Sequence, residues 1–497
     1  MESTRPKKGQ NQFGDFQTPA ALADEVCRLL AAPAFRPATI VEPTCGQGAF
    51  VHAALAHFPD AEVVGIEINP QYVDQLRGSL QGETRATIEL GDFFAVDWQS
   101  KLLRFPQPIL LMGNPPWVTN AQQTLLASEN LPAKSNFERR SGIDAITGKS
   151  NFDISEWMLR RLVSLLAESD GQIAMLCKTI VARKVLQAAW KESLPISQAE
   201  IRQIDAAAHF GVAVDACLFT CRLNGSPTTT VCPTFASLAA KEPISELGVV
   251  DETLIADVRA YQRWQRLAGD SPYQWRSGVK HDCAKVMELR EEEDGQYRNG
   301  LGELVELESD YLYPMLKSSE VAGSDQPEPT RWMLVPQRKT GDPTDEIEQL
   351  APQTWAYLQR HGETLDRRRS SIYRRRPRFS VFGVGDYAFA PWKVAISGFY
   401  KRLRFAVLGP VDDKPIVLDD TVYFAACQSE AEARLIAKLL HSEPAQQFFQ
   451  ALIFWDAKRP ITVDVLKRLD LLALARQCDV EKELLKLIGD RYVTSCF

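Results

Sequence analysis

Hydrophobic and polar positions in the first half of the chain alternate between two patterns. Short apolar runs that end at turns predict buried strands, at residues 38–43, 62–68, 87–93, 108–113 and 172–178. Amphipathic stretches with helical spacing follow them, at residues 49–57, 70–80, 154–167 and about 183–193. Strands that alternate with helices in this way predict an α/β fold with a doubly wound, mostly parallel sheet.

Two further strands, at 201–205 and 216–223, complete a predicted sheet of seven strands. The turn-rich segment after them indicates a boundary, so we expect domains at residues 1–235 and 236–497. Scattered helices and short strands predict a mixed α+β structure for the second domain. A polar insertion of about 30 residues follows the fourth strand, and loops of this length are usually functional or disordered.

Composition agrees with a globular protein of at least two domains. The chain has 497 residues, 45% of them hydrophobic and 24% charged, and its net charge is 57 − 64 = −7. A net acidic chain can still bind nucleic acid if positive charge is concentrated on one face. Residues 361–404 hold such a concentration, with eleven Lys or Arg against three acidic residues.

The chain lacks the sequence signals of membrane, secreted and metal-binding proteins. No apolar run approaches the roughly 20 residues of a membrane span, and the N-terminal segment MESTRPKKGQNQ has no apolar signal core. The ten cysteines include no CxxC pair. We therefore expect a cytoplasmic protein with reduced thiols and no metal site.

Acceptor groups stand at the ends of three consecutive strands. The turn in VEPTCGQGAF (41–50) has Gly46 and Gly48, which let the backbone approach a ligand at the carboxyl end of the first strand. Glu67 ends the second strand, where a carboxylate can accept both ribose hydroxyl groups of a nucleoside. Asp92 ends the third strand and can accept a hydrogen bond from the amine of adenine. Together they predict a nucleoside-binding site.

The nucleoside is not expected to carry a pyrophosphate. The dinucleotide fingerprint needs a third glycine three residues after the second, and Val51 occupies that position. The turn also has no basic side chain. S-adenosylmethionine is a nucleoside ligand without a pyrophosphate, and Phe93 or Ile68 could enclose its adenine ring.

The segment GNPPWV (113–118) ends the fourth strand with groups suited to amine chemistry. The amine of adenine is a poor nucleophile because its lone pair is delocalised into the ring. The side-chain oxygen of Asn114 and the carbonyl of Pro115 could each accept one amine hydrogen, so that the lone pair points at a methyl sulfonium. Pro116 restricts the backbone that aims this carbonyl. Trp117 offers a flat face on which an extruded base could stack.

In order, FGDFQTP, VEPTCGQGAF, GIEINP, GDFF and GNPPWV resemble the motifs of the gamma-class DNA adenine-N6 methyltransferases. The resemblance covers residues 13 to about 223 and implies a class I S-adenosylmethionine-dependent methyltransferase sheet whose last strand is antiparallel. Thr18 would cap a helix begun by Pro19, near the methionine end of the cofactor. The implied cofactor-binding residues are Phe16, Thr18, Glu42, Pro43, Cys45, Gly46, Gly48, Glu67, Ile68, Asp92, Phe93, Asn114 and Phe152. Phe219 and Phe210 are candidates for stacking against the flipped base.

The second half resembles target-recognition domains of such enzymes in restriction–modification systems. The segments LESDYLYPMLKSSEV and RFSVFGVGDYAFAPWKVAISG carry this resemblance, and aromatic residues, including Phe379, are interleaved with the basic ones. The implied partner is double-stranded DNA, and a separately encoded restriction endonuclease is a candidate partner. Predicted DNA contacts are Arg374, Arg375, Arg376, Arg378, Lys393, Lys458 and Arg459. A solvated surface loop is the alternative interpretation of the basic run.

Other functions remain open at this point. An Asn-Pro-Pro-aromatic motif also suits methylation of a protein glutamine or of a guanine in ribosomal RNA. A catalytically silent DNA-binding subunit of a defence complex is a third interpretation. Only about a dozen residues precede FGDFQTP. We therefore expect a modification enzyme without a fused N-terminal nuclease.

Overall fold

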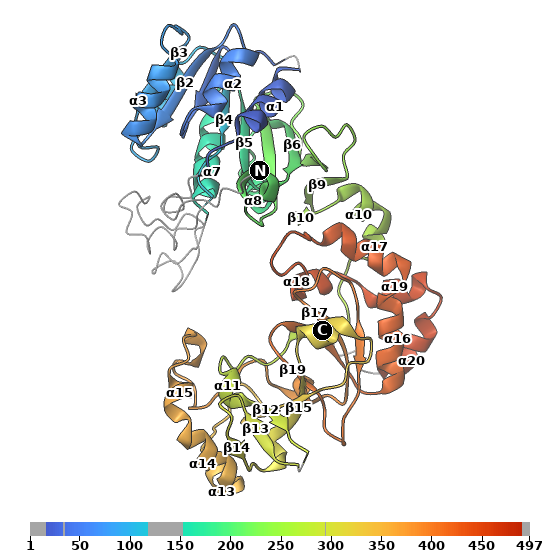
Figure 1. Cartoon of the computed structure of the whole chain (residues 1–497). Coiled ribbons are helices and arrows are strands. Elements are labelled where there is room, and N and C mark those ends of the chain that lie inside the picture. The colour runs from blue at the N-terminus through green and yellow to red at the C-terminus, as the bar shows by residue number, and fades with distance from the viewer. Residues whose placement is uncertain (1–15, 33–34, 118–152, 294, 490–497) are drawn as a thin grey trace. The chain divides into compact units, whose positions relative to one another are not determined.

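The chain folds into two compact units (Figure 1). A computed structural model describes residues 16–32, 35–117, 153–293 and 295–489. The units span Met1–Arg259 and Ala260–Phe497, so the division falls later than the expected boundary at residue 235. The difference arises because three strands after residue 230 extend the sheet of the first unit: β8 (Val231–Phe235), β9 (Ser245–Val250) and β10 (Thr253–Ile255).

The sheet of the first unit contains ten strands in the order β10-β9-β8-β6-β7-β5-β4-β1-β2-β3. The first seven in the chain are β1 (Thr39–Glu42), β2 (Glu62–Glu67), β3 (Ala86–Leu90), β4 (Ile109–Gly113), β5 (Gly171–Lys178), β6 (Ile196–Ile204) and β7 (Ala216–Leu223). β1 to β5 are parallel, and β7 runs antiparallel to β5 and β6. The seven strands and the antiparallel last strand are therefore confirmed, and the sheet is wider than predicted.

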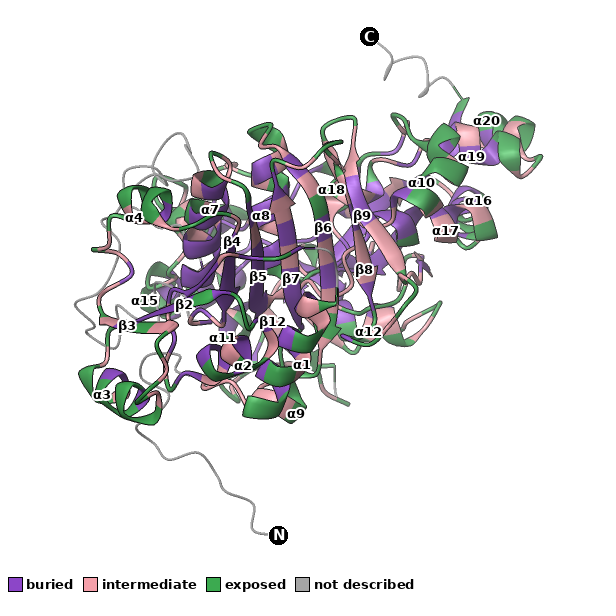
Figure 2. Ribbon diagram, turned by 90° about the horizontal axis from the view of Figure 1, so that it is seen from above, coloured by how far each residue is buried: buried purple, intermediate pink, exposed green. Residues whose placement is uncertain are grey.

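The order of the strands reverses between β1 and β4. The chain proceeds from β1 to β2 and β3 on one side, and from β4 to β5 on the other. β4 is buried along its whole length, as expected for an apolar strand inside a parallel sheet. Figure 2 shows β4, β5 and β7 as largely buried. Open α/β sheets bind ligands at such a reversal, beyond the carboxyl ends of the strands.

Among the described residues of the first unit, seven helices precede or connect these strands. They are α1 (Ala20–Ala31), α2 (Ala49–His57), α3 (Pro70–Ser79), α4 (Trp98–Arg104), α7 (Ile154–Leu166), α8 (Thr179–Lys191) and α9 (Ala206–Phe210). The prediction that Thr18 caps the first helix is wrong. Pro19 is the N-cap of α1, no side chain caps it, and its carbonyl accepts the N–H groups of Leu22 and Ala23.

The second unit contains two sheets with helices around them. One has the order β11 (Trp275–Ser277), β20 (Val422–Cys427), β17 (Trp392–Ser397) and β18 (Ala406–Leu408). The other has the order β14 (Leu304–Val305), β13 (Tyr297–Asn299), β12 (Glu288–Glu291), β16 (Arg331–Leu334), β15 (Leu312–Leu316) and β19 (Val417–Leu418). This architecture agrees with the expected mixed α+β structure.

The helices from the unit division onward are mostly short. They are α10 (Val258–Trp264), α11 (Ala284–Met287), α12 (Ser318–Gly323), α13 (Ile347–Leu350), α14 (Pro352–Arg360), α15 (Gly362–Asp366), α16 (Glu430–Leu440), α17 (Glu443–Leu452), α18 (Val463–Leu466), α19 (Leu471–Gln477) and α20 (Glu481–Ile488). Across the described residues of both units, no helix combines the length and the apolar character that a membrane span requires.

Candidate active site

A cavity of about 410 Å³ lies at the carboxyl ends of β1 to β4. The predicted residues that line it are Phe16, Thr18, Glu42, Pro43, Cys45, Gly46, Glu67, Ile68, Asp92, Phe93, Asn114 and Pro116. Residues not predicted from the sequence complete the lining: Gln17, Thr44, Ala49, Asn69, Tyr72, Gly91, Phe94, Ile154 and Met158. The strand ends that were expected to share a ligand therefore do share one cavity.

Two glycines shape the turn after β1, but in different ways. Gly46 has φ +50°, a backbone conformation that favours glycine, and a Cβ atom there would lie 2.7 Å from Oε1 at the end of the Gln17 side chain. Gly48 has φ +84°, and its Cβ atom would lie 2.3 Å from Leu76 of α3. Gly48 does not line the cavity. The close packing of α3 explains why glycine stands at this position, and a contact of Gly48 with the ligand stays a prediction.

Backbone N–H groups orient the carboxylate of Glu67. The N–H of Gly46 donates to its Oε2 at 2.8 Å, and the N–H of Asn69 donates to its Oε1 at 2.8 Å. The side chain is thereby held at the end of β2, against the glycine turn. An ionised carboxylate can accept several hydrogen bonds. The geometry therefore suits a preset acceptor for a ligand with hydroxyl groups.

The third strand supplies an acceptor beside apolar surface. Asp92 accepts a hydrogen bond from the N–H of Phe94 (3.0 Å), which fixes the direction of its carboxylate. Phe93 reaches the cavity but is largely buried against Trp98, with ring centroids 5.0 Å apart. Ile68 is 46% exposed and offers the more open apolar face. Of the two residues predicted to enclose the adenine ring, Ile68 is therefore the more accessible to a ligand.

Glu42 is a buried carboxyl group at the end of β1. Its Oε2 has no hydrogen-bond partner among the described residues. Burial raises the pKa of Glu42 well above its ordinary range, and the neighbouring charge of Glu67 adds to the shift. Burial also raises the pKa of the nearby Cys45 thiol, and both carboxylates contribute. The cavity thus contains buried oxygens that a ligand with hydrogen-bond donors could pair.

Asn114 presents an unpaired oxygen at the end of β4. Its Nδ2 donates to the carbonyl of Phe16 at 3.0 Å, whereas its buried Oδ1 has no partner in the described part of the chain. The engaged amide nitrogen fixes which atom is the acceptor. A buried acceptor without a partner is energetically costly. Such an atom is expected where a ligand donor completes the hydrogen bond.

Aromatic side chains surround the opposite end of the tetrapeptide. Trp117 is only 4% exposed, its indole N–H donates to the carbonyl of Leu176 (3.3 Å), and its ring lies edge-on to Phe210 at 5.1 Å. The predicted open stacking face of Trp117 is therefore absent here. Phe219 is 0% exposed in the core of β7, so its predicted role against a base is wrong. Phe210 remains half-buried, and Phe152 lies outside the described residues.

Sequence comparison identifies the family. No model of a known protein family matches the chain. The chain is 45% identical over 474 residues to Type II methyltransferase M.NspV of Nostoc sp. (strain ATCC 29411 / PCC 7524), an alignment that covers 95% of this chain and 98% of the relative. The chain belongs to the Type II methyltransferases.

Further similarities agree with this family. Type II methyltransferase M.XamI of Xanthomonas campestris pv. amaranthicola is 36% identical over 108 residues, which cover 21% of this methyltransferase and 20% of the relative. Among solved structures, the Type IIL restriction–modification enzyme MmeI in complex with DNA matches with a TM-score of 0.52 and 14% identity. That match covers 92% of this chain and 64% of MmeI. The class I methyltransferase fold expected from the sequence is confirmed.

The predicted basic contacts of the methyltransferase differ in their surroundings. Arg374, Arg375 and Arg376 are exposed and consecutive. Arg378 is exposed but paired with Asp366, at 2.9 Å. The three consecutive arginines therefore offer the more accessible positive charge.

Three other predicted contacts lie elsewhere in the second unit. Lys458 is exposed. The guanidinium of Arg459 lies over the ring of Phe399 (4.6 Å to the centroid) and 4.0 Å from Asp420. Lys393 is only 1% exposed and donates to the carbonyl of Ala390 at 2.6 Å. Burial lowers the pKa of Lys393 to about 7. The prediction that Lys393 contacts DNA is wrong, because β17 directs this side chain inward.

Some of the residues missed from the sequence had a local signal. Gln17 belongs to the FGDFQTP motif and accepts a hydrogen bond from the N–H of Gln47 at 3.0 Å. Ile154 and Met158 stand four positions apart on α7, so they share one face of that helix.

Phe379, one of the aromatic residues predicted in the basic region, is instead buried. Among the described residues, no cluster of three His, Cys, Asp or Glu side chains could hold a metal ion.

Replacing Glu42 with glutamine should stabilise the ligand-free methyltransferase at neutral pH. Because the folded-state pKa of Glu42 is raised, the folded protein retains a proton that the unfolded chain releases above the ordinary value of 4.5. Wild-type stability therefore falls as the pH rises through this range, and the variant lacks that loss. Denaturant unfolding should show the variant to be the more stable at neutral pH, with the difference shrinking by at most about 1.4 kcal/mol per pH unit as the pH falls towards the ordinary pKa of 4.5.

The control for this variant is Glu62→Gln, which removes an exposed carboxylate from the start of β2. Its stability should change by less than about 0.5 kcal/mol. If Glu42→Gln were less stable than the wild type at neutral pH, the carboxyl group would instead be held ionised by favourable contacts.

Proposed function

We propose that this methyltransferase transfers a methyl group from S-adenosylmethionine to the N6 amine of an adenine flipped out of duplex DNA. The proposal includes protection of host DNA within a restriction–modification system, beside a separately encoded endonuclease. The observation that carries it is the buried, unpaired Oδ1 of Asn114, in a cavity shared with Glu67 and Asp92.

The cavity residues fit S-adenosylmethionine. Glu67 would accept hydrogen bonds from the ribose hydroxyl groups, and Asp92 would accept one from the adenine amine of the cofactor. Ile68 would contact the adenine ring. The buried carboxyl group of Glu42 would offer its unpaired Oε2 to the ammonium group of the methionine part. This last pairing also explains why an acidic residue is buried where no cation of the described chain neutralises it.

The residues after β4 supply the groups that an adenine amine requires. Bound S-adenosylmethionine supplies an electrophilic methyl group on its sulfonium. Asn114 Oδ1 and the Pro115 carbonyl would each accept one hydrogen of the target amine and direct its lone pair. Phe16 holds the other end of the Asn114 amide, so the oxygen is aimed before the substrate arrives. Preset acceptors of this kind avoid reorganisation during the reaction.

Phe210 is the proposed stacking partner of the flipped base. It is half-buried and rests against Trp117, which in turn contacts Phe16 with a centroid separation of 6.0 Å. Trp117 would then support Phe210 from behind, and the flipped base would stack on Phe210 and not on Trp117. Stacking on an aromatic ring is worth about 1–3 kcal/mol per base, which offsets part of the cost of extrusion.

The substrate is tested most directly with labelled S-adenosylmethionine. The full chain is incubated with separate pools of duplex DNA, ribosomal RNA and protein, and modified bases are mapped in the labelled pool. Label on adenine N6 in DNA is the expected result. Label confined to RNA guanine or protein glutamine would replace the proposed substrate, and binding of cofactor without transfer to any pool would indicate a silent subunit.

Replacing Asn114 with alanine should lower the transfer rate by about 10²–10³ while cofactor binding stays within about threefold of the wild type. Loss of one preset polar group in an active site typically costs about 10²–10³ in kcat. Binding is measured by calorimetry and transfer by single-turnover labelling. Asn224→Ala serves as the control, because that amide donates to the carbonyls of Ala167 and Ser169 away from the cavity. Full activity of Asn114→Ala would show that the Asn114 side chain takes no part in the reaction.

Changing Arg374, Arg375 and Arg376 to glutamine should weaken DNA binding on all sequences alike. Each lost phosphate contact should lower the slope of log affinity against log salt by about 0.9. A charge-matched control replaces the exposed cations Arg434, Lys438 and Lys467. If the wild type and the Arg374–Arg376 variant showed equal slopes of log affinity against log salt, the three arginines would belong to a solvated loop that does not contact DNA.

A further inference from the structure

Lys178, the last residue of β5, joins two segments that meet beside the catalytic tetrapeptide. Its Nζ donates to the carbonyl of Trp117 at 3.0 Å and to Oδ2 of Asp153 at 2.6 Å. The side chains of Lys178 and Asp153 are 21% and 10% exposed. The ammonium group is therefore held between the end of the tetrapeptide and the start of α7, with limited access to water.

Trp117 has a second contact with the same strand. Its indole N–H donates to the carbonyl of Leu176, two residues before Lys178. At the other end of the tetrapeptide, Gly113 of β4 is paired with Met175 of β5. The segment from Asn114 to Trp117 is thus anchored to β5 on both sides, and Lys178 holds its downstream end.

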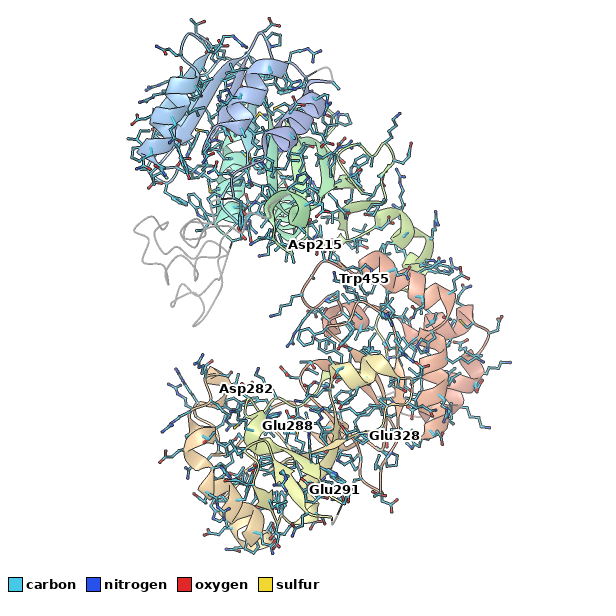
Figure 3. All side chains as sticks on the ribbon, viewed as in Figure 1. Asp215, Asp282, Glu288, Glu291, Glu328 and Trp455 are labelled. Atoms are coloured by element: carbon cyan, nitrogen blue, oxygen red, sulfur yellow. The ribbon has the colours of Figure 1, made fainter. Side chains whose placement is uncertain are left out.

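The end of β5 is itself fixed. The N–H of Thr179, which follows Lys178, donates to the carbonyl of Asp215 at 3.0 Å (Figure 3 labels Asp215). Lys178 also pairs with Ala216 at the start of β7. The ammonium group therefore extends from a backbone position that two neighbouring segments constrain.

Asp153 connects this anchor to the wall of the cofactor cavity. It is the N-cap of α7, where its Oδ1 accepts the N–H and the hydroxyl of Ser155 at 3.1 and 2.5 Å. The first two turns of α7 carry Ile154 and Met158, which line the cavity. One cation thus links the strand end that holds Asn114 to the helix that faces the cofactor side.

We propose that Lys178 is a positioning residue for methyl transfer. By holding the Trp117 carbonyl and Asp153 together, it sets the path of the backbone between Gly113 and Trp117, and with it the place of the Asn114 oxygen. Lys178 acts through this backbone and is not assigned any contact with the substrate. The inference relies on the proposed role of Asn114, but not on the identity of the methyl acceptor.

The competing interpretation is a purely structural ion pair. Lys101 provides a matched comparison in the same unit, because its Nζ lies 2.6 Å from Glu89 and its side chain is 22% exposed. That pair joins α4 to β3 and does not contact the tetrapeptide. The two lysines are buried to a similar extent, but only Lys178 also binds the tetrapeptide, through the carbonyl of Trp117.

The test compares Lys178→Ala, Lys178→Arg, Asp153→Asn and Lys101→Ala in the full chain. Asparagine at 153 keeps an N-cap acceptor but removes the charge. For each variant, the melting temperature, the dissociation constant for S-adenosylmethionine and single-turnover transfer are measured. The methyl acceptor is whichever pool the wild type labels.

Lys178→Ala should lower the transfer rate by about tenfold to a hundredfold, with the cofactor dissociation constant within about threefold, as expected for a small misplacement of a reacting group. Lys178→Arg should recover part of the rate, and Asp153→Asn should show a loss of the same kind. Lys101→Ala should lose stability without losing rate. Adding Asp153→Asn to Lys178→Ala should cost little more, because both act through one contact.

Equal transfer rates for wild type, Lys178→Ala and Asp153→Asn would overturn the inference. Rate losses that follow the melting temperature equally in the Lys178 and Lys101 variants would also overturn it. If Lys178→Ala does not fold, Lys178→Arg and Asp153→Asn decide by the same criteria. A wild type that labels RNA or protein would refute the proposed DNA substrate and leave this comparison intact.

Discussion

The close approach of the end of β4 to the end of β1 is the constraint on which the site depends. Gly113 has φ +149°, and a Cβ atom there would lie 3.2 Å from Cγ of Glu42. Without a side chain at this point, the backbone can turn so that Asn114 follows beside the buried carboxyl group. The strand reversal between β1 and β4 then places the acceptors of three other strand ends in the same cavity.

The cavity is built to be completed by a ligand. Glu67 stands close enough for its charge to raise the pKa of Glu42, and three buried oxygens of the lining, on Glu42, Thr44 and Asn114, lack partners among the described residues. Such an arrangement costs stability in the ligand-free chain. A bound cation with hydrogen-bond donors would recover that cost. Binding energy and folding energy are therefore linked at this site, as is common where polar groups are buried for function.

Sequence patterns correctly predicted which residues meet at the ends of the strands. They failed for residues whose role depends on whether the side chain is buried. Asn114 and Glu67 share a cavity because consecutive parallel strands end at one edge, and that rule needs no tertiary detail. The exposure of Trp117 and Lys393 was predicted wrongly. Neither a tryptophan after prolines nor a lysine in a basic region has neighbours in the sequence that indicate burial by distant segments. The packing of Gly48 against Leu76 could not be predicted, because Leu76 comes from another helix. The domain boundary was placed early because strands β8 to β10 come after a turn-rich segment that resembles a linker.

The Cys45 thiol has a consequence for the fidelity of the enzyme. It lines the same cavity as the proposed methyl donor, and a thiolate is a far stronger nucleophile than the amine of a base. Burial, with the adjacent carboxylates of Glu42 and Glu67, raises the pKa of Cys45 above its ordinary value, so the sulfur keeps its proton. The burial and the acidic neighbours that shape the cavity thus also keep a thiol in its lining in the protonated, less nucleophilic form.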